Sequence, residues 1–269
     1  MPVTEQAGFP TYWTRYGEGG ARPALLIHCS LAHSGSWAQM ASELAPRLAM
    51  TAFDMPGHGR SAAWAEDGEI QQRTAEIAAS FLDAPTDLIG HSFGATLALR
   101  LAVERPELVR SLTLIEPVFF AVAFADHPEM RAEEQARDAA FRDAMEAGDM
   151  RAAARAFTGN WGDGTAWETL PEAQKNHLAS QMYLVAAGRA ALYEDAGGML
   201  APGRLARVAC PVLLIEGSTS PPIISAITEG LAARLPDARR RVIEGAGHMA
   251  PITHARQVAE EIRRFLDEA

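Results

Sequence analysis

The sequence has few cysteines, no long apolar run and no excess of positive charge. Only two cysteines, Cys29 and Cys210, occur in 269 residues, which argues against a disulfide framework and for a reducing compartment. No apolar run approaches the roughly 20 residues that cross a bilayer, and residues 1–10 lack the basic and apolar regions of a signal peptide. The formal net charge of −10 disfavours nucleic acid and anionic membranes as partners. We therefore expect a cytoplasmic protein with neither a nucleic-acid nor a membrane partner.

Recognisable cofactor motifs are also missing. The chain has no P-loop, no dinucleotide-type glycine pattern and no cluster of metal-ligand residues, so we expect no cofactor and no metal. The hydrophobic share of 48% and the charged share of 22% are those of a globular protein that can bury a sizeable core.

Short apolar runs alternate with amphipathic helical patterns along most of the chain. The runs are too short for helices and nearly continuous in apolar residues, as parallel strands buried on both faces should be. They cover residues 24–27, 49–53, 87–89, 111–115, 212–215 and 241–243. Helical patterns cover residues 70–82, 95–102 and 258–266. This order predicts an α/β fold, an open and mostly parallel sheet with helices on both faces, which binds ligands at the carboxyl ends of its strands.

Residues 119–200 interrupt the alternation. This stretch has no convincing strand pattern and is rich in alanine, arginine and glutamate. An insertion of that length between sheet strands is hard to place as a loop. We interpret it as a helical cap on a core made of residues 1–118 and 201–269; the alternative is a set of ordinary outer helices.

The candidate nucleophile lies in Gly90-His91-Ser92-Phe93-Gly94. This segment matches the G-x-S-x-G nucleophile elbow, with a predicted strand before it and a predicted helix after it. A sharp turn would expose the Ser92 hydroxyl, and glycines on either side would avoid collisions with neighbouring backbone. The alternative is a tight turn in which Ser92 only caps a helix.

The candidate base is His248, in a glycine-rich loop after the last predicted strand. An imidazole titrates near neutrality, so it can take the Ser92 proton and return it. The alternative is an ordinary solvated loop histidine.

Together these motifs resemble the α/β-hydrolase fold superfamily, in its branch of cofactor-free serine hydrolases with a helical cap. The resemblance extends to the loop that contains His28 and Trp37 and to the turn over residues 54–61. It implies a mostly parallel eight-stranded sheet. It also implies an oxyanion hole made by the backbone N–H groups of Phe93 and Ser30, although Cys29 replaces the glycine expected before Ser30.

The triad acid departs from the resemblance. The expected position, three residues after Gly217, holds Ser220, which carries no charge. Glu116 follows the neighbouring predicted strand and is our candidate for the acid, since either strand end reaches the same imidazole. Glu216 is the second candidate, and a Ser–His pair without an acid is the third.

A serine nucleophile predicts acyl transfer through an acyl-enzyme on Ser92. The resemblance implies a small or medium ester, thioester or lactone as the small-molecule substrate. Carbon–carbon bond hydrolysis and a non-catalytic ligand-binding relative are the alternatives. The oligomeric state is left open, with a homodimer among the options. The candidate pocket residues, each of which could instead be core packing, are His33, Trp161, Trp167, Phe119, Phe120 and Tyr183.

Overall fold

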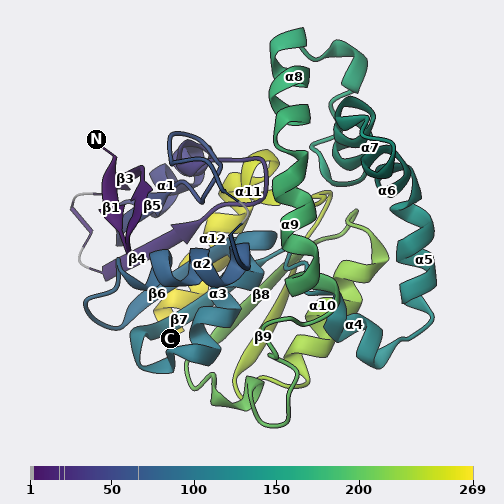
Figure 1. Cartoon of the computed structure of the whole chain (residues 1–269). Helices are drawn as coiled ribbons and strands as arrows, with labels where there is room; N and C mark the ends of the chain where they lie inside the picture. Colours follow the sequence, from purple (N-terminus) through teal and green to yellow (C-terminus); the bar gives the residue numbers. More distant parts are fainter. Residues whose placement is uncertain (1–2, 18, 21, 66, 269) are drawn as a thin grey trace.

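The computed structural model describes residues 3–17, 19–20, 22–65 and 67–268 (Figure 1). Its strands are β1 (Thr4–Gln6), β2 (Phe9–Thr11), β3 (Trp13–Tyr16), β4 (Arg22–Ile27), β5 (Leu48–Phe53), β6 (Thr86–His91), β7 (Val109–Ile115), β8 (Val212–Gly217) and β9 (Ala238–Ile243). Its α-helices are α1 (Ala38–Leu44), α2 (Ile70–Ala79), α3 (Phe93–Glu104), α4 (Phe120–Asp126), α5 (Met130–Arg137), α6 (Ala139–Glu146), α7 (Met150–Trp161), α8 (Glu172–Ser180), α9 (Met182–Tyr193), α10 (Pro222–Ala232), α11 (Ala250–Thr253) and α12 (Ala255–Glu268).

The central sheet is mostly parallel, as predicted. Its strand order is β3-β5-β4-β6-β7-β8-β9, and only β3 pairs antiparallel, with β5. All six predicted strands occur, each within a slightly longer observed strand. The expectation of eight strands is wrong for the part of the chain that is described: the central sheet has seven, and β1 and β2 form a separate two-stranded sheet.

Hydrogen bonds to a distant loop separate the small sheet from the large one. Between β2 and β3, the N–H of Tyr12 donates to Ser61 Oγ at 2.9 Å. The carbonyl of Pro10 accepts from the N–H of Ala62 at 3.0 Å, and proline has no N–H to offer a further strand. These backbone groups are therefore bonded to the loop, and the strand is interrupted at Tyr12.

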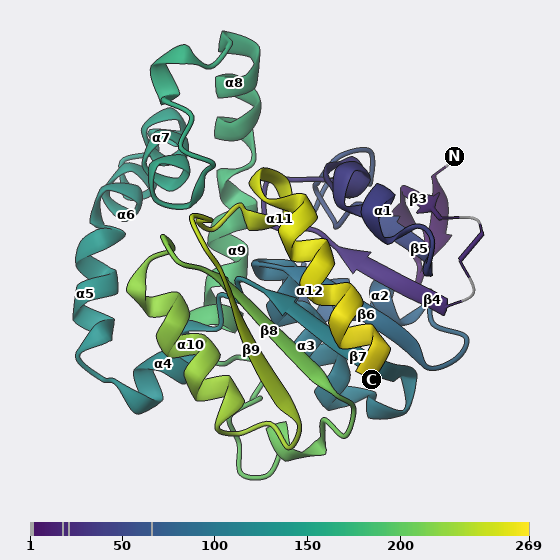
Figure 2. The same ribbon diagram turned by 180° about the vertical axis from the view of Figure 1, so that it is seen from behind.

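Helices cover both faces of the sheet, because successive apolar residues of the strands point to opposite sides. Helices α2, α3, α4 and α10 pack with one face in the larger core, and α1, α11 and α12 pack with the other. Figure 1 shows α2 and α3 in front of the sheet, and Figure 2 shows α12 crossing the opposite face. No helix among the described residues combines the length and the apolar character needed to cross a bilayer.

The segment between β7 and β8 is helical. Residues 119–200, all of them described, contain α4 to α9 and no strand. Helix α4 packs against α10 in the larger core, whereas Phe141, Ala153 and Met182 are part of a small separate cluster between α6, α7 and α9. Helices α6 to α8 stand above one end of the sheet, and α5 leads up to them along its side (Figure 1). The division into core and cap at residues 118 and 200 stays a prediction.

A buried ion cluster ties three strands of the sheet together. The Asp87 carboxylate in β6 is bonded by Arg22 from β4 and by Arg110 from β7, each at 2.6 Å. Ser111 also donates to it at 2.6 Å. Burial raises the pKa of Asp87, but the hydrogen bonds from Arg110, Arg22 and Ser111 outweigh it and hold the pKa below its ordinary value. The cluster lies at the start of β6, at the opposite end of the strand from Ser92.

Candidate active site

Ser92 forms a strained turn between β6 and α3. Its φ of 56° and ψ of −118° lie in a region that residues with a side chain rarely adopt. A Cβ atom on Gly90 would stand 2.3 Å from the Gly94 carbonyl oxygen, and one on Gly94 would stand 2.3 Å from the Ile27 carbonyl oxygen. Both glycines are therefore required by close backbone contacts, and the turn directs the Ser92 side chain into a cavity.

The structure brings Ser92, His248 and Glu116 into one chain of hydrogen bonds. His248 lies in the loop between β9 and α11. Its Nε2 is 2.9 Å from Ser92 Oγ, and its Nδ1 is 3.0 Å from Glu116 Oε2. The exposed fractions are 7% for Ser92, 6% for His248 and 0% for Glu116. With the proton on Nδ1, His248 presents a lone pair to the serine hydroxyl, which is the arrangement of a general base.

Glu116 is held by three donors at the end of β7. Besides His248, the Gly217 N–H donates to its Oε1 at 2.6 Å and the Ser220 hydroxyl at 2.7 Å. The Glu116 backbone has a φ of 52°, a strained left-handed conformation. Strands β7 and β8 are parallel neighbours, so a carboxylate after β7 reaches the space beside the end of β8. Ser220, at the position where an acid was expected, therefore donates to the carboxylate of the candidate acid from the neighbouring strand.

Glu216, the second candidate, points elsewhere. Its carboxylate accepts hydrogen bonds from Thr228 and, at 3.0 Å, from Arg240. Those partners lie on α10 and β9. Glu216 thus links α10 to β9 by hydrogen bonds, and it is not bonded to His248.

Three buried histidines, which we call the histidine trio, are kept neutral near the site. Burial lowers the pKa of His58 to about 4 and that of His91 to about 3, and it lowers the pKa of His28 well below its ordinary value. Neutral His91 donates from Nε2 to the His248 carbonyl oxygen at 2.8 Å. His91 therefore supports the backbone of the candidate base from beneath the turn.

The two expected oxyanion donors border the same cavity as Ser92. Phe93 is the first residue of α3, where a backbone N–H has no intrahelical acceptor. Ser30 comes from the loop after β4, in which Leu31, and not Cys29, has a positive φ of 64°. Cys29 can therefore replace glycine without backbone strain. Burial raises the pKa of its thiol to about 12, so the thiol stays protonated.

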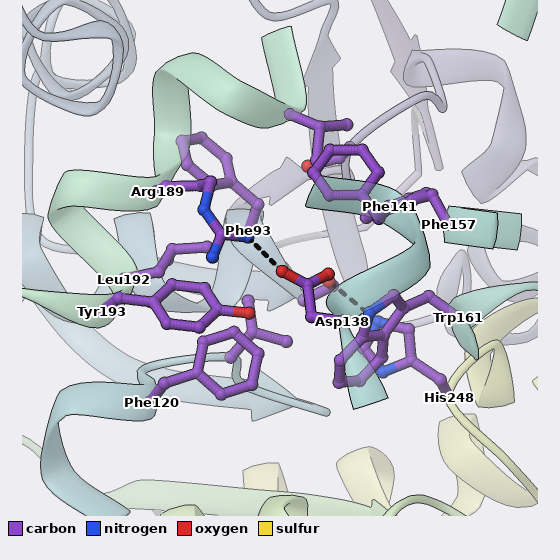
Figure 3. Close-up of a pocket in the computed structure, with 14 residues that line it drawn as sticks. Phe93, Phe120, Asp138, Phe141, Phe157, Trp161, Arg189, Leu192, Tyr193 and His248 are labelled. Carbon is purple, nitrogen blue, oxygen red and sulfur yellow. Dashed lines mark hydrogen bonds and ion pairs between the residues drawn. The ribbon is translucent and has the colours of Figure 1, made fainter. Parts of the chain in front are cut away.

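The cavity beside Ser92 is small and mostly apolar (Figure 3). Its volume is about 50 Å³. A neighbouring hollow of about 190 Å³ shares Ser30, Phe157 and Trp161 with it. Trp161 also presents its ring edge-on to His248, with centroids 4.7 Å apart. The two spaces therefore adjoin at these residues.

Four of the six predicted pocket residues, including Tyr183, lie outside this cavity. His33 borders a separate polar hollow, where its Nδ1 accepts from the Gly35 N–H. Trp167 begins a short 3₁₀ helix (Trp167–Thr169) and packs on the small helical cluster. Phe119 is fully buried in the larger core. These positions follow from helix packing, which the sequence does not fix. Of the remaining candidates, Trp161 and Phe120 line the cavity and Tyr183 does not.

The cavity wall also contains an ion pair that was not predicted from the sequence. Asp138 and Arg189 both line the cavity, with Arg189 Nη1 and Asp138 Oδ2 2.7 Å apart. Arg189 is the one charged residue in the otherwise apolar helix α9, and that isolated charge was the signal that could have identified it. Among the described residues, no group of three or more His, Cys, Asp or Glu side chains is arranged to hold a metal ion.

Comparisons with known proteins identify the family of the chain. Residues 24–261 match the model of the alpha/beta hydrolase family. The chain is 30% identical over 259 residues to a pimeloyl-[acyl-carrier protein] methyl ester esterase of Xanthomonas campestris pv. campestris, covering 92% of this chain and 96% of that protein. It is 38% identical over 106 residues to lipase LipV of Mycobacterium tuberculosis, a match that covers 38% of this chain and 40% of that protein. The enol-lactonase of Burkholderia xenovorans LB400 has a similar structure, with a TM-score of 0.73, 17% identity and coverage of 99% and 100%.

Proposed function

This chain belongs to the alpha/beta hydrolase family and is a carboxylic ester hydrolase, and we propose that it cleaves esters of short acyl groups through an acyl-enzyme on Ser92. The observation that carries the proposal is the unbroken series of hydrogen bonds from the Ser92 hydroxyl through His248 to Glu116. A methyl ester esterase that aligns along nearly its whole length supports ester hydrolysis as the reaction.

The first half of the reaction forms the acyl-enzyme. His248 Nε2 takes the Ser92 proton as Oγ attacks the ester carbonyl. The carbonyl oxygen becomes an oxyanion, which accepts hydrogen bonds from the N–H groups of Phe93 and Ser30. Each such donor is worth about 2.7–4 kcal/mol in the transition state. The His248 imidazolium, stabilised by the Glu116 carboxylate, then protonates the leaving alcohol.

The second half releases the acid. A water molecule loses a proton to His248 and attacks the acyl carbonyl on Ser92, and the same N–H groups hold the second oxyanion. Its collapse breaks the ester bond to Oγ, and the proton on His248 returns to the serine. The carboxylic acid product then leaves, and the enzyme is restored.

The size of the cavity supports a short acyl group. The acyl carbon is bonded to Ser92 in the intermediate, so the acyl chain occupies the space that Ser92 borders. That space is about 50 Å³, and a water-sized group needs roughly 10–15 Å³ on the same scale. The neighbouring hollow of about 190 Å³ is the place for the leaving alcohol.

The test is hydrolysis of p-nitrophenyl acetate and p-nitrophenyl butyrate, together with labelling by a fluorophosphonate. We expect turnover and a label on Ser92 in the wild type, and neither in Ser92→Ala. Ser42→Ala, on the exposed side of α1, is the matched control and should behave as wild type. Equal turnover in Ser92→Ala and wild type, or a label on another residue, would refute the acyl-enzyme.

A further inference from the structure

The wall of the cavity beside Ser92 contains one charged pair. Figure 3 shows Asp138 and Arg189 in direct contact in this wall, and their side chains are 7% and 30% exposed. The rest of the wall beyond the reacting residues is aliphatic or aromatic. It includes Val118, Phe120, Phe141, Phe157, Val185 and Leu192. The pair is therefore the main polar feature that an acyl chain would meet on leaving Ser92.

The position of Asp138 in the chain shows that its carboxylate is directed to the cavity. Asp138 precedes the first residue of α6, where an aspartate usually accepts hydrogen bonds from the free N–H groups of the helix. Here its side chain makes no such bond. Its Oδ2 accepts from Arg189, and no described residue donates to its Oδ1. One acceptor oxygen thus remains available at the cavity wall.

Arg189 is held in place from its other side. Its guanidinium carbon lies 4.3 Å from the ring centroid of Tyr193, a cation–π contact. The Tyr193 hydroxyl in turn donates to Glu134 Oε1 at 3.2 Å. Only one hydrogen bond from the guanidinium, that to Asp138, is made within the described part of the chain. Arg189, which borders both this cavity and a second hollow, is therefore fixed beside the free Asp138 oxygen with N–H groups left to donate.

A structural role alone gives little reason for such a pair. Replacing a buried ion pair by apolar residues of similar volume is often neutral or stabilising, because the charges lose their hydration. A site with unsatisfied polar groups, in contrast, discriminates strongly against ligands that cannot bond to them. We infer that the Asp138–Arg189 pair selects acyl groups that carry a neutral donor and acceptor of hydrogen bonds, such as a hydroxyl or an amide. This inference rests on the proposed function.

Charge explains why the selected group is neutral. A hydroxyl can donate to Asp138 Oδ1 and accept from Arg189 at the same time, as the adjacent free donor and acceptor require. A carboxylate on the acyl chain would be repelled by Asp138, and an ammonium group would be repelled by Arg189. A purely apolar chain would leave Asp138 Oδ1 and the remaining N–H groups of Arg189 without a bond.

The experiment compares three p-nitrophenyl esters of similar acyl length: butyrate, 3-hydroxybutyrate and hemisuccinate. In the wild type we expect kcat/KM for 3-hydroxybutyrate to exceed that for the other two by about 10- to 100-fold, the range expected for one hydrogen bond to a charged group. In Asp138→Leu/Arg189→Leu the order should reverse, because kcat/KM should rise for butyrate and fall for 3-hydroxybutyrate. Asp138→Asn keeps the shape of the side chain and provides the measurement if the double variant does not fold.

The matched control is Asp126→Leu/Arg234→Leu. That pair joins the end of α4 to the turn after α10 at 2.6 Å, is similarly exposed on its arginine side, and lies outside the cavity. Its removal should leave the ratio of kcat/KM values unchanged. An unchanged ratio in the Asp138 and Arg189 variants, or an equal loss for all three esters, would make the pair a structural clamp and overturn the inference. If the wild type showed neither turnover of these esters nor a label on Ser92, the proposed function itself would be refuted.

Discussion

Replacing Glu116 by glutamine removes the negative charge beside His248 and keeps the side chain almost the same size. The Gly217 N–H and the Ser220 hydroxyl both donate to Oε1, so the amide carbonyl of glutamine should take that position. Its NH₂ group then faces His248 Nδ1, which must accept instead of donate. The imidazole proton moves to Nε2, and His248 can no longer take a proton from Ser92.

The wrong tautomer costs about 10⁴ in kcat in a serine protease triad, which is about 5 kcal/mol. We expect a loss of that order in Glu116→Gln, measured with p-nitrophenyl acetate, while the thermal unfolding curve stays close to wild type. The alternative amide orientation would leave the Gly217 N–H facing another donor in a buried place, which costs about 1–3 kcal/mol. It would lessen the loss of kcat but also lower stability.

Glu216→Gln is the matched control, because that carboxylate faces Thr228 and Arg240. Its kcat should stay within a few-fold of wild type. The exchange Glu116→Ser/Ser220→Asp, which places a carboxylate after β8 instead of β7, should recover part of the lost kcat. A Glu116→Gln enzyme that folds normally and keeps kcat within about tenfold of wild type would remove Glu116 from the triad.

Three further outcomes follow from buried contacts. Gly94→Ala should fail to fold or lose most of its stability in urea unfolding, because the new Cβ would stand 2.3 Å from the Ile27 carbonyl oxygen; a stable, active variant would contradict the close contact. Asp87→Ala should lower the free energy of unfolding by roughly 2–3 kcal/mol, less than for a fully buried pair because both arginine partners are partly exposed; a change under about 0.5 kcal/mol would refute this role of the cluster. The histidine trio has lowered pKa values in the fold, so below about pH 6.5 the unfolded chain binds more protons than the native one. The free energy of unfolding should then fall by up to about 4 kcal/mol per pH unit between about pH 5.5 and 4, and a flat profile from pH 7 to 4 would contradict neutral burial.

Most of the fold could be predicted from the sequence, because the patterns that indicate strands and helices are local. Strands such as β6 and β8 are buried on both faces, so they appear as uninterrupted apolar runs. The number of strands in the sheet was wrong because it depends on Tyr12 and Pro10 bonding to a loop about 50 residues away, which no local pattern reveals.

In the candidate site, the residues at strand ends could be predicted from the sequence and the residues of the pocket walls could not. Ser92, His248 and Glu116 follow strand ends, and a parallel sheet brings such positions to one edge; the structure does bring them together, while their catalytic roles stay predictions. The pocket walls come from helices whose mutual packing is tertiary. His33, Trp167 and Phe119 therefore lie outside the cavity, and Asp138 and Arg189 were not foreseen.

The position of the acid can shift between strands because β7 and β8 end side by side. The Glu116 N–H donates to the Ile215 carbonyl at 2.8 Å, and the Gly217 N–H returns a hydrogen bond to the Glu116 carboxylate. A carboxylate from either strand end thus enters the same small space beside His248. The longer glutamate side chain and the positive φ of 52° at Glu116 turn it across to the β8 side. Ser220 then donates to the charge, so the candidate triad needs one carboxylate at this place, and either strand end can supply it.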